Sequence, residues 1–241
     1  MNAIRKVDLK QPTMDNFYEL AMDTFDTVCN LKVRLGGQYL PKCHFMDGQK
    51  YVCMDEMMKD IERQECIVYS FGIGSDWSFE QDISDMGCKV FAYDPTINRP
   101  WNMSRNIMFK KKGVVGISNK NATYSTLKEV LRSNGHENTK ISYMKLDIEG
   151  HELSGLPLWL KSGALDKLEQ IAIEVHLEEP LQEEKTLEFL KTFQQLHLIG
   201  NYRIINWEAN NCWKNLNKRY DYFALSEIVL KKIDLDNICV Q

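Results

Sequence analysis

Short apolar runs that end at a glycine or a polar residue recur along this sequence, and they constrain its fold more than any other feature. Residues 66–71 (CIVYSF) end at Gly72, and residues 89–93 (KVFAY) end at Asp94. Runs this apolar are typical of strands buried on both faces of a parallel sheet. A segment with helical spacing, residues 78–86, separates them. Alternating strands and helices predict a doubly wound α/β fold with helices on both faces of the sheet.

The remaining expected elements follow the same alternation. Further strands are predicted at residues 113–117, 141–146, 171–175, 202–207 and 222–230, and further helices at 125–133, 156–162 and 183–196. With the first two runs, these make seven strands. Pro157 is expected in the first turn of its helix, where a missing amide hydrogen costs least. Residues 38–65 are expected to be irregular, because Pro41 and Gly48 interrupt them.

The first part of the chain has a different pattern. Over residues 15–35, apolar residues recur at three- and four-residue steps and predict one amphipathic helix that ends at Gly36. We therefore expect residues 1–47 to form a helical extension and residues 48–241 to form the main domain. No apolar run reaches the roughly 18 residues that a membrane-spanning helix requires, so no transmembrane segment is expected.

Composition and charge limit the possible functions. The 241 residues are 44% hydrophobic and 27% charged, which indicates a folded domain rather than a disordered chain. Thirty basic and 34 acidic side chains give a net charge of −4, so binding of nucleic acid through overall charge is not expected. The seven cysteines include no C-x-x-C pair, which argues against a zinc ribbon. The sequence leaves the oligomeric state open.

The turn after the first strand has the composition of a ligand-binding loop. It reads Phe71-Gly72-Ile73-Gly74-Ser75-Asp76-Trp77. Glycine permits positive φ and lets a ligand approach the backbone, and a helix N-terminus offers free N–H groups. Asp94 follows the first glycine by 94 − 72 = 22 residues, where a carboxylate can accept hydrogen bonds from both hydroxyls of a ribose. These residues therefore predict a site for an adenosine-type ligand.

Trp77 narrows the identity of that ligand. It occupies the position at which a dinucleotide-binding fingerprint has its third glycine. An indole there obstructs close packing of helix on strand and the path of a pyrophosphate. This favours S-adenosylmethionine over NAD and makes an NAD-dependent oxidoreductase the weaker hypothesis. An ordinary strand–helix turn that binds no ligand is the structural alternative.

Three segments resemble a known family. Val68–Glu80 resembles the first motif of the methyltransferase-like family related to human methyltransferase-like protein 24, and Ile173–His176 matches a later strand of that family. Lys145–Glu152 resembles the Lys-x-Asp-x-Glu-Gly-x-Glu motif that the family shares with FkbM-type O-methyltransferases. The resemblance spans about residues 48–230. It implies a Rossmann-like class I methyltransferase that uses S-adenosylmethionine, with a seven-stranded, mostly parallel sheet and an antiparallel last strand. Because FkbM-type relatives methylate hydroxyl groups of sugars and natural products, it also implies O-methylation of a glycan or small molecule.

Chemistry-bearing side chains are predicted to meet where the fourth and fifth strands end. Ligands bind at this edge of an open α/β sheet. We expect His176 to act as the base that takes the hydroxyl proton, because an imidazole suits that task near neutral pH. Asp147 is expected beside the sulfonium or the acceptor, and Glu149 is expected to shape the acceptor side. Trp207 is expected to stack on a sugar ring, and Ser118 is included among the cofactor-binding residues.

Alternatives stay open for this cluster. A carboxylate could orient the histidine or take the proton itself. A divalent cation held by Asp147, His176 and another acid could instead acidify the acceptor, although nothing in the spacing requires a metal. His151 and Glu152 are interpreted as capping and solvated residues at a helix start. For the whole domain, the alternative is a non-catalytic domain of methyltransferase fold that binds S-adenosylmethionine or a partner protein.

The resemblance also implies a disulfide. Members of the family have cysteines at positions similar to Cys53 and Cys66, which implies a bridge that closes 66 − 53 = 13 residues. Such a bridge stabilises a fold by up to about 3 kcal/mol in the chain-entropy account. It favours an oxidising compartment such as the Golgi lumen. Two separate thiols in a cytosolic protein are the alternative.

Overall fold

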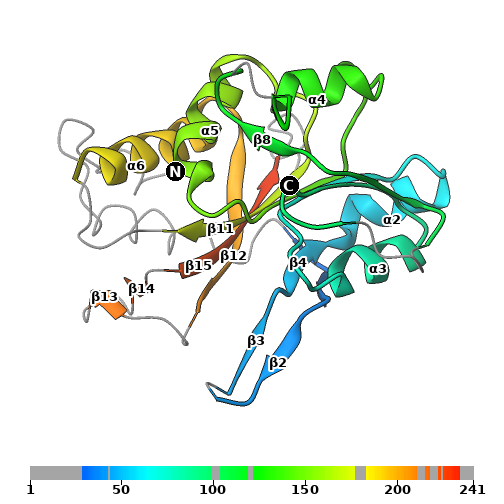
Figure 1. The fold of residues 1–241 in the computed structure, drawn as a ribbon, viewed down its shortest axis with the longest axis horizontal. Coiled ribbons are helices and arrows are strands. Elements are labelled where there is room, and N and C mark those ends of the chain that lie inside the picture. Colours follow the sequence, from blue (N-terminus) through cyan, green and yellow to red (C-terminus); the bar gives the residue numbers. More distant parts are fainter. Residues whose placement is uncertain are drawn as a thin grey trace.

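Strands and helices alternate along most of the chain, as the apolar runs predict (Figure 1). The computed structural model describes residues 29–42, 44–98, 104–118, 122–176, 183–210, 215–217, 222–223 and 225–233. The strands are β1 (Lys32–Leu35), β2 (Gln38–Leu40), β3 (Phe45–Asp47), β4 (Lys50–Cys53), β5 (Ile67–Phe71), β6 (Lys89–Tyr93), β7 (Ile107–Lys110), β8 (Gly113–Val115), β9 (Tyr124–Thr126), β10 (Tyr143–Leu146), β11 (Gln170–His176), β12 (Tyr202–Ala209), β13 (Asn215–Asn217), β14 (Tyr222–Phe223) and β15 (Leu225–Lys232). The helices are α2 (Met54–Glu62), α3 (Ser78–Asp85), α4 (Leu127–Ser133), α5 (His151–Lys161) and α6 (Glu183–Leu198).

The main sheet has seven strands, the predicted number, and six of them are predicted strands. Their order is β12-β15-β11-β10-β5-β6-β7. β15 runs antiparallel to both of its neighbours, and the other neighbouring pairs are parallel. This confirms the class I methyltransferase topology with an antiparallel last strand. It also brings the ends of β5, β6, β10 and β11 to one edge of the sheet.

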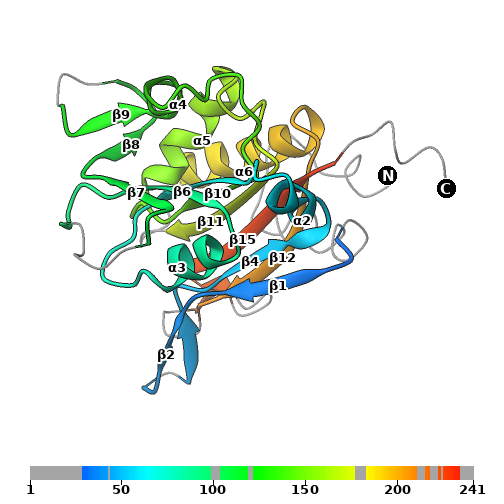
Figure 2. The same ribbon diagram turned by 90° about the vertical axis from the view of Figure 1, so that its right-hand side faces the viewer.

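Helices cover both faces of the sheet (Figure 2). On one face, α4, α5 and α6 bury a first core that includes Leu131, Trp159 and Phe193. On the other face, α2, α3 and β4 bury a second core that includes Met57 and Phe79. Because both faces are covered, the carboxyl-end edge of the sheet is where side chains of different strands can meet around a ligand.

The helix expected over residues 15–35 is wrong where the structure describes it. Residues 32–35 form β1, which pairs antiparallel with β4. Before the strand, the Leu31 carbonyl accepts a hydrogen bond of 2.8 Å from the Met54 amide. Pairing with β4 satisfies the backbone here and outweighs the helical spacing. Residues 15–28 lie outside the described residues, and the domain boundary at residue 47 stays a prediction.

Residues 38–65 are not irregular. They contain the hairpin of β2 and β3, which projects from the body of the molecule, then β4 and α2 (Figures 1 and 2). Pro41 lies in the turn of the hairpin, and Gly48, with φ of +79°, lies in the turn between β3 and β4. The prediction is wrong because both residues form turns between short strands, which is an ordinary use of proline and glycine.

The third predicted strand is not part of the main sheet. β8, at residues 113–115, pairs with β9 in a separate two-stranded sheet, and β7 takes the edge position of the main sheet. β7 ends at Lys110, and Lys111 and Lys112 follow it. These charged residues make the short apolar run of β7 hard to recognise in the sequence. The last predicted strand is also two elements, because β14 pairs with β13 and only β15 joins the main sheet.

α5 begins at His151 rather than at residue 156, so Pro157 lies inside the helix and not in its first turn. Gly150, with φ of +90°, precedes the helix. The Ile148 amide donates a hydrogen bond of 2.9 Å to Glu152 Oε1. This bond fixes the start of α5 earlier than the proline suggests.

The cysteines pair differently from the implied Cys53–Cys66 bridge. Among the described residues, disulfides join Cys29 to Cys53 and Cys66 to Cys88. Cys66 and Cys88 precede the neighbouring strands β5 and β6, where the Lys89 amide donates to the Cys66 carbonyl at 2.9 Å. The pairing of β5 with β6 thus brings Cys66 next to Cys88, although they are 22 residues apart in the sequence.

Candidate active site

The ends of β5 and β10 meet at Gly72. Its amide donates to the Tyr93 carbonyl at 2.9 Å, and the Asp147 amide donates to the Phe71 carbonyl at 3.0 Å. Gly72 has φ of +74°, and a Cβ on it would lie 1.5 Å from the Asp147 carbonyl oxygen. Only glycine fits this position, so the turn after β5 and the loop after β10 are held in one fixed arrangement.

The rest of the turn opens outward. Gly74 has φ of +60°, and a Cβ there would meet no atom within 4 Å, so a ligand could approach the backbone. Asp76 accepts a hydrogen bond of 2.9 Å from the Ser78 amide at the start of α3. Trp77 packs its ring edge-on against Phe109, with centroids 5.6 Å apart. The turn contains the predicted cofactor residues Phe71, Gly72, Ile73, Gly74, Ser75, Asp76 and Trp77.

Asp94 is bound to this turn in the described structure. Its Oδ2 accepts the amides of Ile73 and Gly74 at 2.9 and 3.0 Å, and its Oδ1 accepts the amide and hydroxyl of Thr96 at 2.7 and 2.6 Å. Burial would raise the pKa of the Asp94 carboxyl, but the hydrogen bonds from Thr96 and from the two amides outweigh it and hold the pKa below its usual value. The carboxylate is therefore ionised, and a ribose would share its oxygens with Thr96.

Two predicted residues, Ser118 and Trp207, are not part of the turn. The Ser118 hydroxyl, on the exposed segment after β8, hydrogen-bonds Glu129 near the start of α4. Trp207 lies on β12, the outermost strand, and packs against the first core. β11 and β15 separate its strand from β10, so the structure does not bring Trp207 and Asp147 together through neighbouring strands. Trp101 and Trp213, also considered as sugar-stacking residues, lie outside the described residues.

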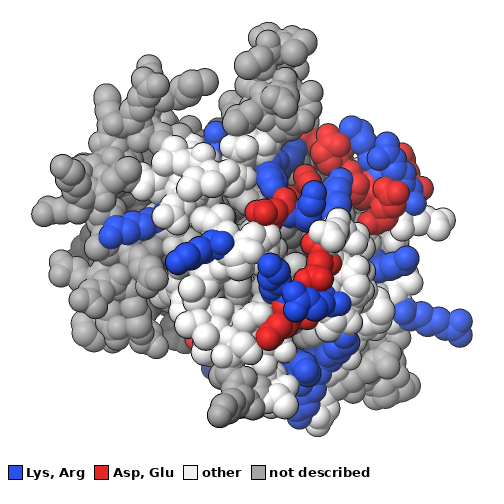
Figure 3. Space-filling view, turned by 90° about the horizontal axis from the view of Figure 1, so that it is seen from above, with Lys and Arg blue, Asp and Glu red and all other residues white. Residues whose placement is uncertain are grey.

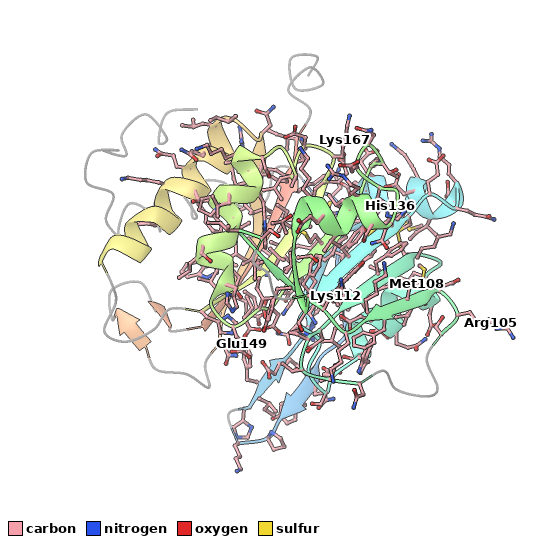
Figure 4. The ribbon with its side chains drawn as sticks, turned by 45° about the horizontal axis from the view of Figure 1, so that its top comes forward. Arg105, Met108, Lys112, His136, Glu149 and Lys167 are labelled. Atoms are coloured by element: carbon pink, nitrogen blue, oxygen red, sulfur yellow. A yellow bond between two sulfur atoms is a disulfide. The ribbon has the colours of Figure 1, made fainter. Side chains whose placement is uncertain are left out.

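Asp147, Glu149 and His176 converge where β10 and β11 end. His176 Nε2 lies 4.0 Å from Asp147 Oδ1 and 3.5 Å from Glu149 Oε2. Ligand atoms of the three side chains all lie within 4.8 Å of one another, a spacing that one cation could bridge. The side chains of His176 and Asp147 are 15% and 25% exposed and that of Glu149 is 85% exposed, so the cluster opens to solvent beside Glu149 in the loop that leads into α5 (Figure 4).

Glu152 holds the other side of the imidazole. Its Oε1 lies 3.1 Å from His176 Nδ1 and also accepts the Ile148 amide. The Glu152 side chain is completely buried, so the expected solvation is wrong, whereas its bond with the Ile148 amide at the start of α5 agrees with the expected capping. His151 beside it is exposed, as expected. The sequence signal for Glu152 was the acid at the end of the motif at residues 145–152, which ordinary capping seemed to explain.

The acids around His176 act on its charge. Burial lowers the pKa of the His176 imidazole, but the hydrogen bond that its Nδ1–H donates to Glu152 and the negative charges of Glu152, Asp147 and Glu149 raise it above the usual value. The same arrangement makes this corner of the molecule attractive to any cation.

A second polar cluster lies directly behind Asp147. Glu174 of β11 and Glu227 of β15 are paired in register, and Lys50 of β4 forms a buried ion pair with Glu227. Burial, together with the charges of Glu227 and Asp147, raises the pKa of Glu174 to about 10, so that side chain is protonated at neutral pH. Lys50 stays charged, because the neighbouring acids more than offset its burial and raise its pKa. Sequence reasoning missed Lys50, because it lay in a segment expected to be irregular.

The described part of the face of the molecule in Figure 3 has no large patch of only positive or only negative side chains. On the face in Figure 3, lysines and arginines lie among aspartates and glutamates. The structure describes no helix that is both long enough and apolar enough to cross a membrane. That nucleic acid is not a partner stays a prediction.

Comparison with known proteins adds independent information. The sequence pattern of the methyltransferase domain family matches residues 6–223. Methyltransferase-like protein 24 of Homo sapiens is 26% identical over 142 residues, which cover 54% of this chain and 38% of that protein. The protein of the same name from Rattus norvegicus is 28% identical over 142 residues, which cover 54% and 39%. The chain thus spans about two fifths of the length of these relatives.

Two solved structures are also similar. The bifunctional kinase-methyltransferase WbdD has a TM-score of 0.40 and 12% identity, over 74% of this chain and 39% of that one. The 1,6-didemethyltoxoflavin-N1-methyltransferase of Burkholderia thailandensis has a TM-score of 0.36 and 12% identity, over 75% and 78%.

Proposed function

Because the chain belongs to the methyltransferase domain family, we propose that this S-adenosylmethionine-dependent methyltransferase methylates a hydroxyl group, with a carbohydrate as the expected acceptor. One observation carries the proposal. His176 stands between the buried Glu152 and the open pair of Asp147 and Glu149, on the same sheet edge as the glycine turn. A hydroxyl needs such a group because it must lose its proton before or as it accepts a methyl group.

The residues of the glycine turn fit S-adenosylmethionine. The open space beside Gly74 lets a ligand approach the backbone, and Gly72 keeps that backbone next to the Asp147 loop. In the proposal, the turn holds the amino-acid part of the cofactor and Asp94 accepts hydrogen bonds from its ribose. When bound, S-adenosylmethionine supplies an electrophilic methyl carbon on a sulfonium.

The residues of this chain must remove the proton of the acceptor hydroxyl. In the direct version, His176 Nε2 accepts that proton, while Glu152 holds Nδ1–H and so fixes the tautomer and the ring orientation. Asp147 and Glu149 stabilise the imidazolium that results. The acceptor gains the methyl group and loses one proton, so the charges balance when the sulfonium becomes a thioether.

The test of this proposal is turnover. Purified protein is incubated with S-adenosylmethionine and a panel of neutral sugars, oligosaccharides and small alcohols, and S-adenosylhomocysteine release is measured. Release that depends on a hydroxyl acceptor, with the new methyl group located on oxygen by mass spectrometry, supports the proposal. Methylation on nitrogen would contradict it. Cofactor binding without release on any acceptor would support the non-catalytic alternative.

Asp94→Ala is expected to weaken S-adenosylmethionine binding by about 2–4 kcal/mol, because charge-assisted hydrogen bonds to the ribose are lost. Calorimetry measures the change. Thr96→Val is the matched control: it removes one hydroxyl from Asp94 Oδ1 and leaves the carboxylate in place. Affinity in this control should stay the same or rise, because an acceptor site on Oδ1 is freed. Undiminished binding by Asp94→Ala would remove Asp94 from the cofactor site.

The two disulfides support an oxidising location such as the secretory pathway, since thiols in the cytosol stay reduced. Four of the seven cysteines are paired among the described residues, and the other 7 − 4 = 3 lie outside them. Protein made in an oxidising host and denatured without reductant is therefore expected to show no more than three reactive thiols. Seven reactive thiols would favour a cytosolic protein.

A further inference from the structure

Three electron-pair donors lie around one point where β10 and β11 end. Glu152 Oε1 contacts His176 Nδ1, so Nδ1 carries the proton that this contact needs. In the neutral imidazole, Nε2 then has a lone pair. It faces oxygen atoms of Asp147 and Glu149, which are also acceptors. Three electron-pair donors therefore face one point.

The separations at this point suit an ion better than hydrogen bonds. The Nε2–oxygen distances of 3.5 and 4.0 Å exceed those of a good N–H···O bond, about 2.7–3.2 Å. Two ligands bound to one metal at about 2.0–2.2 Å stand roughly 3–4 Å apart. The three side chains can therefore share an ion with small adjustments of their rotamers.

Glu152 provides independent support. Its side chain is completely buried, and its Oε2 has no hydrogen-bond partner in the part of the chain that the structure describes. A buried carboxylate with an unpaired oxygen is costly unless a positive charge lies close by. Metal-binding histidines characteristically donate their second nitrogen to a carboxylate, which is the arrangement of His176 and Glu152.

The charge count points the same way. Acidic side chains at or next to this point are Asp147, Glu149, Glu152, Glu174 and Glu227. Two buried lysines lie beside them: Lys50 is paired with Glu227, and Lys145, whose charge also acts on Glu227, lies 3.3 Å from Glu80. Next to the one imidazole of His176 lie the three carboxylates of Asp147, Glu149 and Glu152, and a divalent ion would balance their charge.

We infer that Asp147, Glu149 and His176 form a binding site for a divalent transition-metal ion of the Mn²⁺ type, with Glu152 as the carboxylate that orients His176. One imidazole and two carboxylates suit Mn²⁺ better than Mg²⁺ or Ca²⁺, which prefer oxygen ligands throughout. Glu149 is exposed, so an ion can reach the site from solvent, and water or an acceptor hydroxyl can complete its coordination.

The site changes how the proposed function would work. A metal ion would lower the pKa of a coordinated hydroxyl, the proton would pass to solvent water beside the exposed Glu149, and His176 would serve as a metal ligand in place of taking the proton directly. Only this role of the metal ion in catalysis rests on the proposed function. Metal binding itself is a property of the chain and can be measured without cofactor or acceptor.

The experiment titrates Mn²⁺ into cofactor-free protein and follows free Mn²⁺ by electron paramagnetic resonance. One ion per chain is expected. Glu149→Gln should weaken binding at least tenfold, and because this side chain is exposed, the variant should fold normally. Glu152→Gln should weaken binding by about 10–100-fold, as loss of an orienting carboxylate does. Mg²⁺ should compete only weakly.

Glu62→Gln on the exposed surface of α2 is the matched control, and it should bind Mn²⁺ like the unchanged protein. Equal Mn²⁺ affinity in Glu149→Gln and the unchanged protein, or no bound ion at all, would overturn the inference. The cluster would then be an ion-pair network around a protonated His176. S-adenosylmethionine binding, measured without metal on the same samples, shows separately whether the proposed function holds.

Discussion

His176→Ala is expected to lower turnover by about 10²–10⁴-fold and to leave S-adenosylmethionine affinity nearly unchanged. Nε2 is the imidazole atom that faces Asp147 and Glu149, whereas the cofactor turn is built from residues 71–77. The loss follows whether His176 accepts the proton directly or holds a metal ion that acidifies the hydroxyl. Single-turnover kinetics and calorimetry measure the two quantities separately.

The alanine variant also removes the imidazole that contacts the buried Glu152, so a second variant that keeps a donor there is needed. In His176→Asn, the side-chain amide can still donate to Glu152, but no nitrogen occupies the place of Nε2. It should fold like the unchanged protein and be as inactive as the alanine variant. His151→Ala removes an exposed histidine from the same loop region and should leave turnover intact. Full activity in His176→Asn would make His176 a structural residue.

Chelation separates the two versions of the mechanism. Protein treated with EDTA and then dialysed should retain its turnover if His176 is the direct base. It should lose turnover and regain it with Mn²⁺ if the cluster binds a metal ion. Either outcome is compatible with methylation of a hydroxyl, and only the second supports the metal site.

The fold was predictable wherever strands are buried on both faces. The run at residues 66–71 and the run at 171–175 each became a central strand within a residue of the expected bounds, because uninterrupted apolar sequence has few other solutions in a domain of this size. β7 was missed because an edge strand tolerates charge, and Lys110 ends it. β1 was mistaken for a helix because its partner, β4, lies about twenty residues further along the chain. Local spacing carries no information about such a pairing.

The candidate site was predictable where its residues follow buried strands, and not where they come from other elements. Asp147 and His176 follow buried strands that the sequence reveals, so their convergence follows from the sheet order. Glu152 was undervalued because its burial depends on where α5 begins, and Pro157 suggested a later start. Lys50 was missed because it reaches Glu227 from β4, which lies outside the main sheet and 177 residues away along the chain. A side chain that reaches a site from a distant part of the sequence can be identified only once the tertiary structure is known.

Gly72→Ala is expected to destabilise the fold by more than about 4 kcal/mol or to prevent folding. The added Cβ would lie 1.5 Å from the Asp147 carbonyl oxygen, and the position has φ of +74°. Neither backbone can move freely, because the Gly72 amide is bonded to Tyr93 in β6 and the Asp147 amide is bonded to Phe71 in β5. Relief would require the ends of β5 and β10 to separate. Urea unfolding measures the free-energy change.

Gly74→Ala is the matched comparison, because it places the same methyl group two residues away at φ of +60°, where no atom lies within 4 Å. Its cost should be only the strain of a left-handed residue, about 1–3 kcal/mol. Its affinity for S-adenosylmethionine should fall even under conditions in which the variant is fully folded, because the methyl group stands where the ligand approaches the backbone. A Gly72→Ala protein as stable as Gly74→Ala would show that the two strand ends do not meet. Unchanged cofactor affinity in Gly74→Ala would move the cofactor away from this turn.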